Sequence, residues 1–263
     1  MNARDRRRAG LWAARSLLLV VGACSSGRTP AAPGPSGAPL NQSSAPSRVL
    51  MLTATAGFRH DSIGTARTVM ADLAAASREF VVTATEDLSS VTAPRLADYD
   101  VLFFALTSGE LAFTDDQKAA ILDFVQRGGG FLGVHSASDT LYGWPDYGRL
   151  LGAYFKEHPW TEQGTVIVED QSHPATAGLG ERFALLEEFY AFRDNPRPRV
   201  QVLLRLDAAS VGTTGDYPLA WVQSFGTGRV YYNALGHFSE TWNDRRFQQQ
   251  LLGAIRWAGR SKK

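Results

Sequence analysis

The stretch Val101-Leu-Phe-Phe-Ala-Leu106 is apolar without interruption, which is typical of a parallel strand that is buried on both faces. It is followed by Thr114-Asp-Asp-Gln117, whose pattern of a hydroxyl residue three positions before a glutamine predicts the start of a helix. That helix is expected to end at the three glycines 128–130. Phe131-Leu-Gly-Val134 then predicts a second buried strand. A strand, a helix and a strand in this order form one unit of a parallel sheet.

The same alternation extends in both directions from this unit. On the N-terminal side, strands are expected at 49–53 and 80–83. Between them, apolar residues recur at helical spacing from Ile63 to Leu73. On the C-terminal side we expect four more strands, at 165–168, 200–206, 219–223 and 230–234. A final helix is expected at 245–259. We therefore predict an α/β fold with a doubly wound, flavodoxin-like and mostly parallel sheet. Helices would cover both of its faces, and some antiparallel strands would be added in the second half.

The composition and charge exclude several classes of protein. Hydrophobic residues make up 44% and charged residues 20% of the 263 residues, which is unlike collagen, a coiled coil or a wholly disordered chain. Residues 1–47 contain six arginines and one acidic residue, which leaves the rest of the chain with four more acidic than basic residues. Because no basic surface is expected there, nucleic acid is not expected to be a partner.

The N-terminus resembles a bacterial secretory signal. Arginines within residues 4–8 precede the apolar run Leu17–Val21, and small residues lead to Cys24, the only cysteine. This order predicts a lipoprotein signal cleaved before Cys24, whose sulfur would carry the lipid that anchors the protein to a membrane of the cell envelope. The alternative is a plain secretory signal cleaved after Ala23, which would give a soluble secreted or periplasmic protein.

The segment that follows is poor in large apolar residues and rich in Ser, Pro, Gly and Ala. Such a segment cannot bury enough surface to offset its ordering entropy, so a disordered tether is expected. The predicted organisation is a signal peptide over 1–23, a tether over 24–47 and one folded domain over 48–260.

Three histidines directly follow predicted strands. His60 follows the strand at 49–53, His135 follows the strand at 131–134, and His237 follows the strand at 230–234. In open α/β sheets, ligands bind beyond the carboxyl ends of the strands. We therefore expect these three side chains to meet at one edge of the sheet.

Further polar and aromatic residues lie near these positions in the sequence. Glu187 and Glu188 follow an apolar stretch. The loop after His135 contains three candidates for the functional site, Asp139, Tyr142 and Trp144. His158 and His173 each precede a proline and are expected in loops. As alternatives to a functional role, a histidine before proline can simply be part of a turn, either glutamate can be solvated, and Trp144 can simply pack.

Three kinds of chemistry fit convergent imidazoles and a carboxylate. They can transfer protons, since an unperturbed histidine titrates near ~6.5. They can bind a divalent metal, for which the candidate ligands are His60, His135, Glu188 and His237. They can also hydrogen-bond a ligand rich in hydroxyl groups. The sequence Gly133-Val-His-Ser-Ala137 has the form of a nucleophile elbow with histidine in the central position.

Several motifs, taken in order, resemble the ThuA-like (trehalose-utilisation) family over about residues 48–259. They are Gly57-Phe-Arg-His60, Tyr99-Asp-Val101, Gly128-Gly-Gly-Phe-Leu-Gly-Val-His135 with Ser138-Asp-Thr140, His173-Pro-Ala-Thr-Ala-Gly-Leu179, Glu188-Phe-Tyr190, Pro218-Leu-Ala-Trp221, Gly228-Arg-Val230, Leu235-Gly-His-Phe238 and Ala254-Ile-Arg-Trp257. The resemblance implies a class I glutamine amidotransferase-like fold. Amidotransferases of this class carry a catalytic cysteine where this chain has His135, so glutaminase activity is not expected.

The resemblance also implies a role in the use of trehalose or of oxidised sugars such as keto-glycosides. In this interpretation the catalytic candidates are His135, His60, Glu188 and Asp139. The candidates for substrate binding are His237, Tyr142, Trp144, Tyr190 and His158. The expected protein is an exported enzyme that isomerises, eliminates or hydrolyses a sugar by proton transfer or with a metal. The alternative is a non-catalytic carbohydrate-binding or interaction domain on the cell surface, in which aromatic residues including Trp160 would stack on sugar rings.

Overall fold

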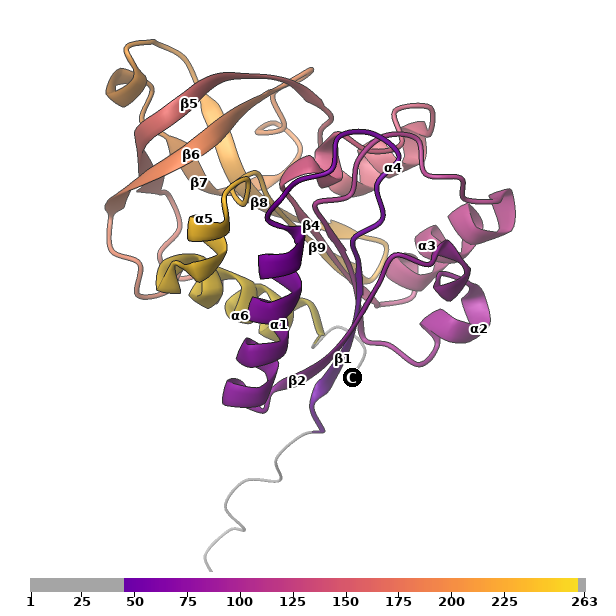
Figure 1. Ribbon diagram of the computed structural model, residues 1–263. Coiled ribbons are helices and arrows are strands. Elements are labelled where there is room, and N and C mark those ends of the chain that lie inside the picture. Colours follow the sequence, from indigo (N-terminus) through magenta and orange to yellow (C-terminus); the bar gives the residue numbers. More distant parts are fainter. Residues whose placement is uncertain (1–44, 260–263) are drawn as a thin grey trace, which may run out of the picture. The chain divides into compact units, whose positions relative to one another are not determined.

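Nine strands form a single sheet in the order β2-β1-β3-β4-β9-β8-β7-β5-β6 (Figure 1) in the computed structural model, which describes residues 45–259. The strands are β1 (Ser47–Leu52), β2 (Phe80–Thr85), β3 (Val101–Ala105), β4 (Gly130–Val134), β5 (Phe155–Val168), β6 (Arg182–Phe192), β7 (Gln201–Leu206), β8 (Tyr217–Phe225) and β9 (Gly228–Asn233). The helices are α1 (Ile63–Ser77), α2 (Ala93–Leu96), α3 (Asp115–Gln126), α4 (Pro145–Leu151), α5 (Ser239–Asn243) and α6 (Arg245–Gly259).

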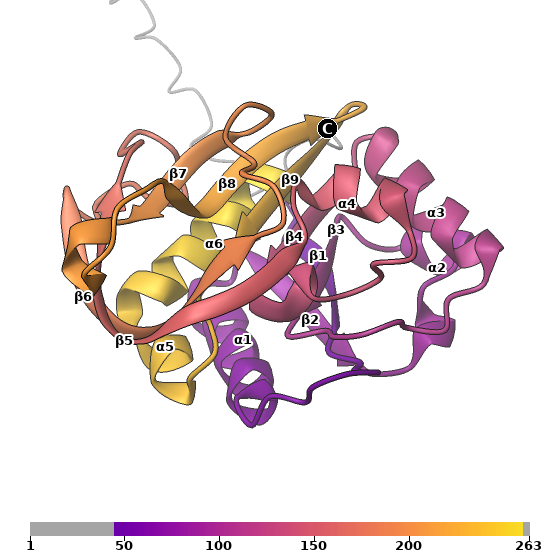
Figure 2. The ribbon, with the colours of Figure 1, turned by 90° about the horizontal axis from the view of Figure 1, so that it is seen from above.

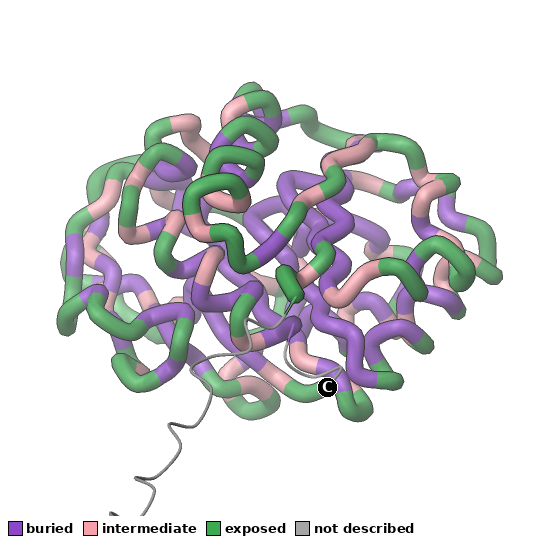
Figure 3. The backbone as a smooth tube through the Cα atoms, turned by 90° about the horizontal axis from the view of Figure 1, so that it is seen from below, coloured by how far each residue is buried: buried purple, intermediate pink, exposed green. Residues whose placement is uncertain are grey.

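The five strands from β2 to β9 are parallel to one another. Every residue of β3 and β4 is buried, as the uninterrupted apolar runs predict. Helices α1, α5 and α6 lie on one side of these strands, and α2, α3 and α4 lie on the other (Figure 2). Buried residues concentrate in the strands, and exposed residues lie mainly on the outer helices and loops (Figure 3).

The remaining four neighbouring pairs of the sheet are antiparallel, and they are β9–β8, β8–β7, β7–β5 and β5–β6. The sheet is therefore mixed, and its antiparallel part is larger than the sequence indicated. Strand β6 and the first half of β5 were not predicted. The adjacent glutamates 187 and 188 interrupt the apolar pattern of β6, and Pro159 interrupts β5. The β5–β6 register shifts between Glu157 and Trp160, and such a bulge accommodates a proline within a strand.

The predicted start of α3 and the predicted bounds of α6 are confirmed. The Thr114 hydroxyl accepts a hydrogen bond from the backbone N–H of Gln117 at 3.2 Å, and the Gln117 side chain accepts one from the Thr114 N–H at 3.0 Å. Helix α6 spans the predicted residues. Strand β1 begins at Ser47, one residue before the expected domain boundary.

The predicted signal peptide, Cys24 and nearly all of the predicted tether lie outside the described residues. Between residues 45 and 259, no helix is long and apolar enough to cross a membrane.

Candidate functional site

Four side chains from distant parts of the sequence meet beyond the carboxyl ends of the parallel strands. His60 lies between β1 and α1, His135 directly follows β4, His237 follows β9, and Glu188 belongs to β6. One potential ligand atom from each of the four lies within 4.8 Å of the others. We refer to these four residues as the His/Glu cluster. The structure thus brings together the three strand-end histidines and adds a carboxylate from the antiparallel half of the sheet.

The backbone of His135 is held in a conformation that directs its side chain into the cluster. Its φ is +53°, a left-handed conformation that is uncommon for residues other than glycine and is found at sharp functional turns. Its Nδ1 atom lies 2.7 Å from the carbonyl oxygen of Ala234. Because a carbonyl oxygen only accepts hydrogen bonds, Nδ1 carries the proton, and the neutral imidazole presents the Nε2 lone pair to the cluster. In this state the hydroxyl of Tyr190 donates to Nε2 at 2.8 Å.

Three potential ligand atoms form a compact triangle. Nε2 of His135 and Nδ1 of His237 are 3.3 Å apart, and they lie 3.4 and 3.1 Å, respectively, from Oε2 of Glu188. With the tautomer fixed by Ala234, the His135 lone pair faces a carboxylate oxygen. Two electron-rich atoms at this distance repel each other unless a proton or a metal ion lies between them. The triangle is therefore a site that attracts a cation.

The electrostatics of the cluster favour a neutral His60 and an ionised Glu188. Burial, reinforced by the neighbouring His135 and His237, lowers the pKa of His60 to about 3. Burial alone would raise the pKa of Glu188, but hydrogen bonds with His135 and His237, which need a proton on the imidazole nitrogen that faces Oε2, outweigh it and hold this pKa well below its usual range. The hydrogen bond to Glu188 raises the pKa of His237. At neutral pH His60 therefore offers an unprotonated nitrogen next to a carboxylate.

Glu187 anchors the loop that carries His237. Its side chain is fully buried. Its Oε1 accepts the backbone N–H groups of Glu188 and His237 at 2.9 and 3.1 Å. Its Oε2 accepts the N–H of Gly236 at 2.9 Å and the hydroxyl of Thr241 at 2.6 Å. The solvated glutamate considered in the sequence analysis is thus excluded for Glu187, and its role as an anchor has no signal in the sequence other than the Glu-Glu pair.

His158 borders the cluster on its exposed side. Its Nδ1 lies 3.3 Å from Oε1 of Glu188, and its side chain is 51% exposed. It lies in the bulged part of β5, not in the loop expected from the following proline. His173 does lie in a loop, but it packs against Trp257, with 5.0 Å between ring centroids, and is not part of the cluster.

Two of the proposed sugar-stacking residues are buried. Tyr190 is 3% exposed, and its ring lies against His135 and Phe155 with centroid distances of 4.3 and 4.4 Å. It therefore acts as a hydrogen-bond partner of His135, and its ring is covered. Trp144 is 8% exposed and stacks on Tyr147, so the packing alternative is correct for this residue.

Asp139 and Tyr142 interact with each other beside the cluster. The Tyr142 hydroxyl donates to Oδ1 of Asp139 at 2.6 Å and to the carbonyl of Phe155 at 3.1 Å. The guanidinium of Arg193 lies 3.9 Å from the centroid of the Tyr142 ring. Asp139 is thus engaged by Tyr142, and among residues 45–259 no hydrogen bond or ion pair joins its side chain to those of the cluster.

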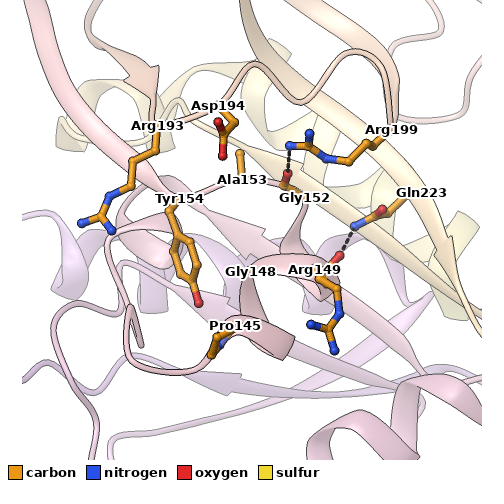
Figure 4. A pocket seen from close by; sticks show the side chains of 10 residues that line it. All are labelled: Pro145, Gly148, Arg149, Gly152, Ala153, Tyr154, Arg193, Asp194, Arg199 and Gln223. Carbon is orange, nitrogen blue, oxygen red and sulfur yellow. Dashed lines mark hydrogen bonds between the residues drawn. The ribbon is translucent and has the colours of Figure 1, made fainter.

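A cavity of about 450 Å³ lies next to α4 (Figure 4). It is lined in part by Arg149, Arg193 and Arg199, and none of the four cluster residues lines it. Figure 4 shows that the three guanidinium groups point in different directions, and Arg199 donates to the carbonyl of Gly152 at 3.3 Å. These groups do not converge on one point, so the His/Glu cluster remains the better candidate.

Comparison with known proteins identifies the family. A family model described as "Trehalose utilisation" matches residues 48–258. The chain belongs to the trehalose-utilisation (ThuA) family. The resemblance noted in the sequence is therefore confirmed, and the match covers all the strand ends that supply the cluster.

Solved structures agree with this assignment. A ThuA-like protein from Bacteroides uniformis is 27% identical with a TM-score of 0.71, covering 84% of this chain and 95% of its own. A ThuA-like protein from Parabacteroides merdae is 20% identical with a TM-score of 0.68, covering 82% and 91%. A β-galactosidase from Bacillus circulans shares the fold over 82% of this ThuA chain but only 31% of its own, at 14% identity and a TM-score of 0.55. No curated protein sequence matches the chain.

Proposed function

We propose that this ThuA-family protein is a metal-dependent enzyme of carbohydrate utilisation, whose divalent transition metal is held by His135, Glu188 and His237. The observation that carries the proposal is the triangle of Nε2, Oε2 and Nδ1 atoms with sides of 3.1–3.4 Å. His60 lies beside the triangle, as a fourth ligand or as a base.

The donor set and its surroundings fit zinc. Ligands at about 2.0–2.2 Å around a tetrahedral zinc are separated by roughly 3.3–3.6 Å from one another, and two histidines with one carboxylate occur in catalytic zinc sites. Ligand histidines in metal sites usually donate their other ring N–H to a carbonyl or carboxylate. His135 does so to Ala234, and Glu187 anchors the backbone of His237.

A metal in this position would polarise a carbonyl oxygen or acidify a bound water. The chain's own groups would handle the protons. His60 is neutral at neutral pH, since its pKa is about 3, which suits a metal ligand better than a base. His158 is exposed next to Glu188 and is placed to hydrogen-bond a substrate hydroxyl. Asp139 is assigned to orienting Tyr142, since these two are hydrogen-bonded.

The family supports a sugar or an oxidised sugar as substrate. For a keto-sugar, removal of the proton next to the carbonyl would lead to isomerisation, epimerisation or elimination, and hydrolysis is equally compatible with the site. We further propose a doubly wound, flavodoxin-like and class I glutamine amidotransferase-like fold, because the order β2-β1-β3-β4-β9 corresponds to the 2-1-3-4-5 order of flavodoxin. With His135 at the elbow, glutaminase activity is not part of this proposal.

The experiment that tests this function measures turnover of a panel of sugars. The purified full-length protein would be incubated with trehalose and with keto-glycosides, as isolated, after chelation and after re-addition of zinc or manganese. We expect conversion that is lost on chelation, restored by metal and abolished in Glu188→Gln, but not in Glu162→Gln, which changes an exposed carboxylate on β5. Binding of sugar that is recovered unchanged under all conditions would show a non-catalytic carbohydrate-binding domain instead.

We also propose that the protein is exported and lipid-anchored, on the basis of the N-terminal sequence up to Cys24. Expression of the full-length chain in a bacterium, followed by fractionation, tests this. The unaltered chain should be found with the membranes, and Cys24→Ser should release it or leave it unprocessed. A Cys24→Ser chain that is processed to the same length as the unaltered chain and still found with the membranes would contradict the lipid anchor.

A further inference from the structure

Phe58 is an exposed aromatic ring next to the His/Glu cluster. Within residues 45–259, the large hydrophobic side chains that are mostly exposed are those of Phe58, Val81 and Leu186, and Phe58 is 64% exposed. The centroid of its ring lies 4.8 Å from that of His60, with the two rings nearly perpendicular. Singly exposed apolar residues are common on protein surfaces, but this one touches a member of the candidate site.

The backbone beneath this ring is held firmly. The Ser108 hydroxyl donates to the carbonyl of Phe58 at 2.5 Å. On one side, Gly57 packs so closely against Gly109 that a Cβ atom on Gly109 would lie 2.5 Å from the Gly57 nitrogen. On the other side, Arg59 donates to both carboxylate oxygens of Glu86, at 3.1 and 2.8 Å. A ring on such an anchored backbone is presented to solvent at a defined position.

The accessible polar groups lie close to this ring. Within the cluster, the exposed fraction rises from 0% for the side chain of His135 to 10% for Glu188 and 23% for His237, and it reaches 51% for the neighbouring His158. His60 bridges the two kinds of surface, since its ring contacts those of Phe58 and His237 with centroid distances of 4.8 and 5.1 Å. A ligand that covers both surfaces needs an apolar face and a polar rim.

We propose that Phe58 is the specificity-determining residue of the site and stacks on the apolar C–H face of a pyranose ring. The hydroxyl or carbonyl groups on the rim of that ring would then reach the imidazoles of the cluster. This inference rests on the proposed sugar-processing function and adds to it the part of the substrate that is recognised. An acyclic polyol has the same hydroxyl groups but no rigid apolar face, and an acyl chain has no polar rim, so neither would fit as well.

Calorimetric titration of the metal-loaded full-length protein tests the proposal. The probes are methyl α-D-glucopyranoside and trehalose as pyranosides and sorbitol as the acyclic polyol. We expect binding of at least one pyranoside, with sorbitol much weaker. Phe58→Ala should raise the dissociation constant by roughly tenfold, which is about 1.4 kcal/mol and more than most interface residues cost on truncation, and Phe58→Tyr should change it less than about threefold. Leu186→Ala removes another exposed apolar side chain and should have no effect.

The failure of this inference can be separated from the failure of the proposed function by measuring metal in the same samples. Unaltered metal content with equal pyranoside affinity in Phe58→Ala would overturn the role of Phe58 and leave the metal site intact. Absence of pyranoside binding, or sorbitol binding of equal strength, would also overturn the inference. Absence of both turnover and metal binding in the unaltered protein would instead overturn the proposed function.

Discussion

Glu187 accepts a hydrogen bond from the backbone N–H of His237 at 3.1 Å, while the neighbouring Glu188 contacts the imidazole of the same histidine at 3.1 Å. Two consecutive residues of β6 thus hold the backbone and the side chain of one loop residue. Glu187 is fully buried, and each of its two carboxylate oxygens accepts two hydrogen bonds. It therefore positions His237 without facing the site itself.

Replacing Glu187 by glutamine should therefore weaken both the fold and the metal site. In either orientation of the glutamine side chain, its NH2 group would face a backbone N–H that the carboxylate now accepts. The buried donors left without an acceptor should cost about 1–3 kcal/mol of unfolding free energy. Metal affinity should fall about 10–100-fold, as is usual when groups behind the ligands are changed. Denaturant titration and metal titration measure the two effects, with Glu162→Gln as the exposed control. Unchanged metal affinity in a folded Glu187→Gln protein would contradict the positioning role.

The assignment of Nε2 of His135 as a ligand predicts opposite effects for two variants. Asparagine tolerates the left-handed backbone of residue 135 but removes Nε2, so His135→Asn should weaken metal binding by roughly 100-fold or more, beyond the 10–100-fold typical of outer groups. Tyr190→Phe removes the hydroxyl that occupies the Nε2 lone pair in the metal-free protein. It should bind metal at least as tightly as the unaltered chain.

Competition with a fluorescent zinc chelator can measure both affinities, and circular dichroism can show that both variants are folded. If Tyr190→Phe lost affinity as severely as His135→Asn, the tyrosine hydroxyl would itself be a ligand, and the assigned set would be wrong.

The low pKa of His60 predicts that the metal-free protein becomes less stable as the pH decreases. Its pKa is about 3 in the folded state and about 6.5 in an unfolded chain. Between these values the unfolded state binds a proton that the folded state does not, so stability falls as the pH decreases. The loss contributed by His60 is at most about 1.4 kcal/mol per pH unit.

Denaturant titrations in the presence of a chelator, between pH 6.5 and 4.5, measure this slope. Within this window Glu188 remains ionised in the folded state, since its pKa is held low, and its effect on the slope near pH 4.5 should be shared by the unaltered chain and the His60→Asn variant. The stabilising contribution of His237, whose pKa is raised, is present below its unfolded pKa. His60→Asn should show a shallower slope than the unaltered chain. Equal slopes would mean that His60 is not held neutral by burial.

Two helical glycines provide a matched test of packing. A Cβ atom on Gly253 in α6 would lie 2.0 Å from the carbonyl oxygen of Pro174, whereas one on Gly64 in α1 would meet nothing within 4 Å. Alanine is favoured over glycine in helices by about 0.5–1 kcal/mol. Gly64→Ala should therefore stabilise the protein by up to that amount, and Gly253→Ala should destabilise it by about 1–3 kcal/mol through overpacking. Thermal unfolding distinguishes the two, and equal shifts would contradict the close approach of α6 to Pro174.

The parallel half of the fold could be predicted because its central strands β3 and β4 are buried throughout and therefore form uninterrupted apolar runs. Strand β3 is an example, since all of its residues are buried. Strand β6 could not be predicted, because it uses two glutamates at its centre for the site. The first half of β5 contains Pro159 within a bulge, which in a sequence indicates a turn.

The convergence of His60, His135 and His237 could be predicted because each lies beyond the carboxyl end of a strand of one parallel sheet. The tautomer of His135 could not, since it depends on the carbonyl of Ala234, which is distant in sequence. The burial of Tyr190 on β6 and the exposure of Phe58 in the loop before α1 likewise depend on how distant segments pack. For this reason the sequence did not indicate that Tyr190 is buried or that Phe58 is exposed.

The metal content of the purified protein shows whether the His/Glu cluster binds one metal ion. Full-length protein would be produced in metal-replete medium, desalted and analysed by inductively coupled plasma mass spectrometry, with His135→Asn and Glu188→Gln as site variants and Glu162→Gln as control. We expect close to one zinc or other divalent transition-metal ion per chain in the unaltered protein and the control, and little in the site variants. Less than about a tenth of an ion per chain, unchanged after incubation with zinc or manganese, would contradict it, as would equal metal content in His135→Asn.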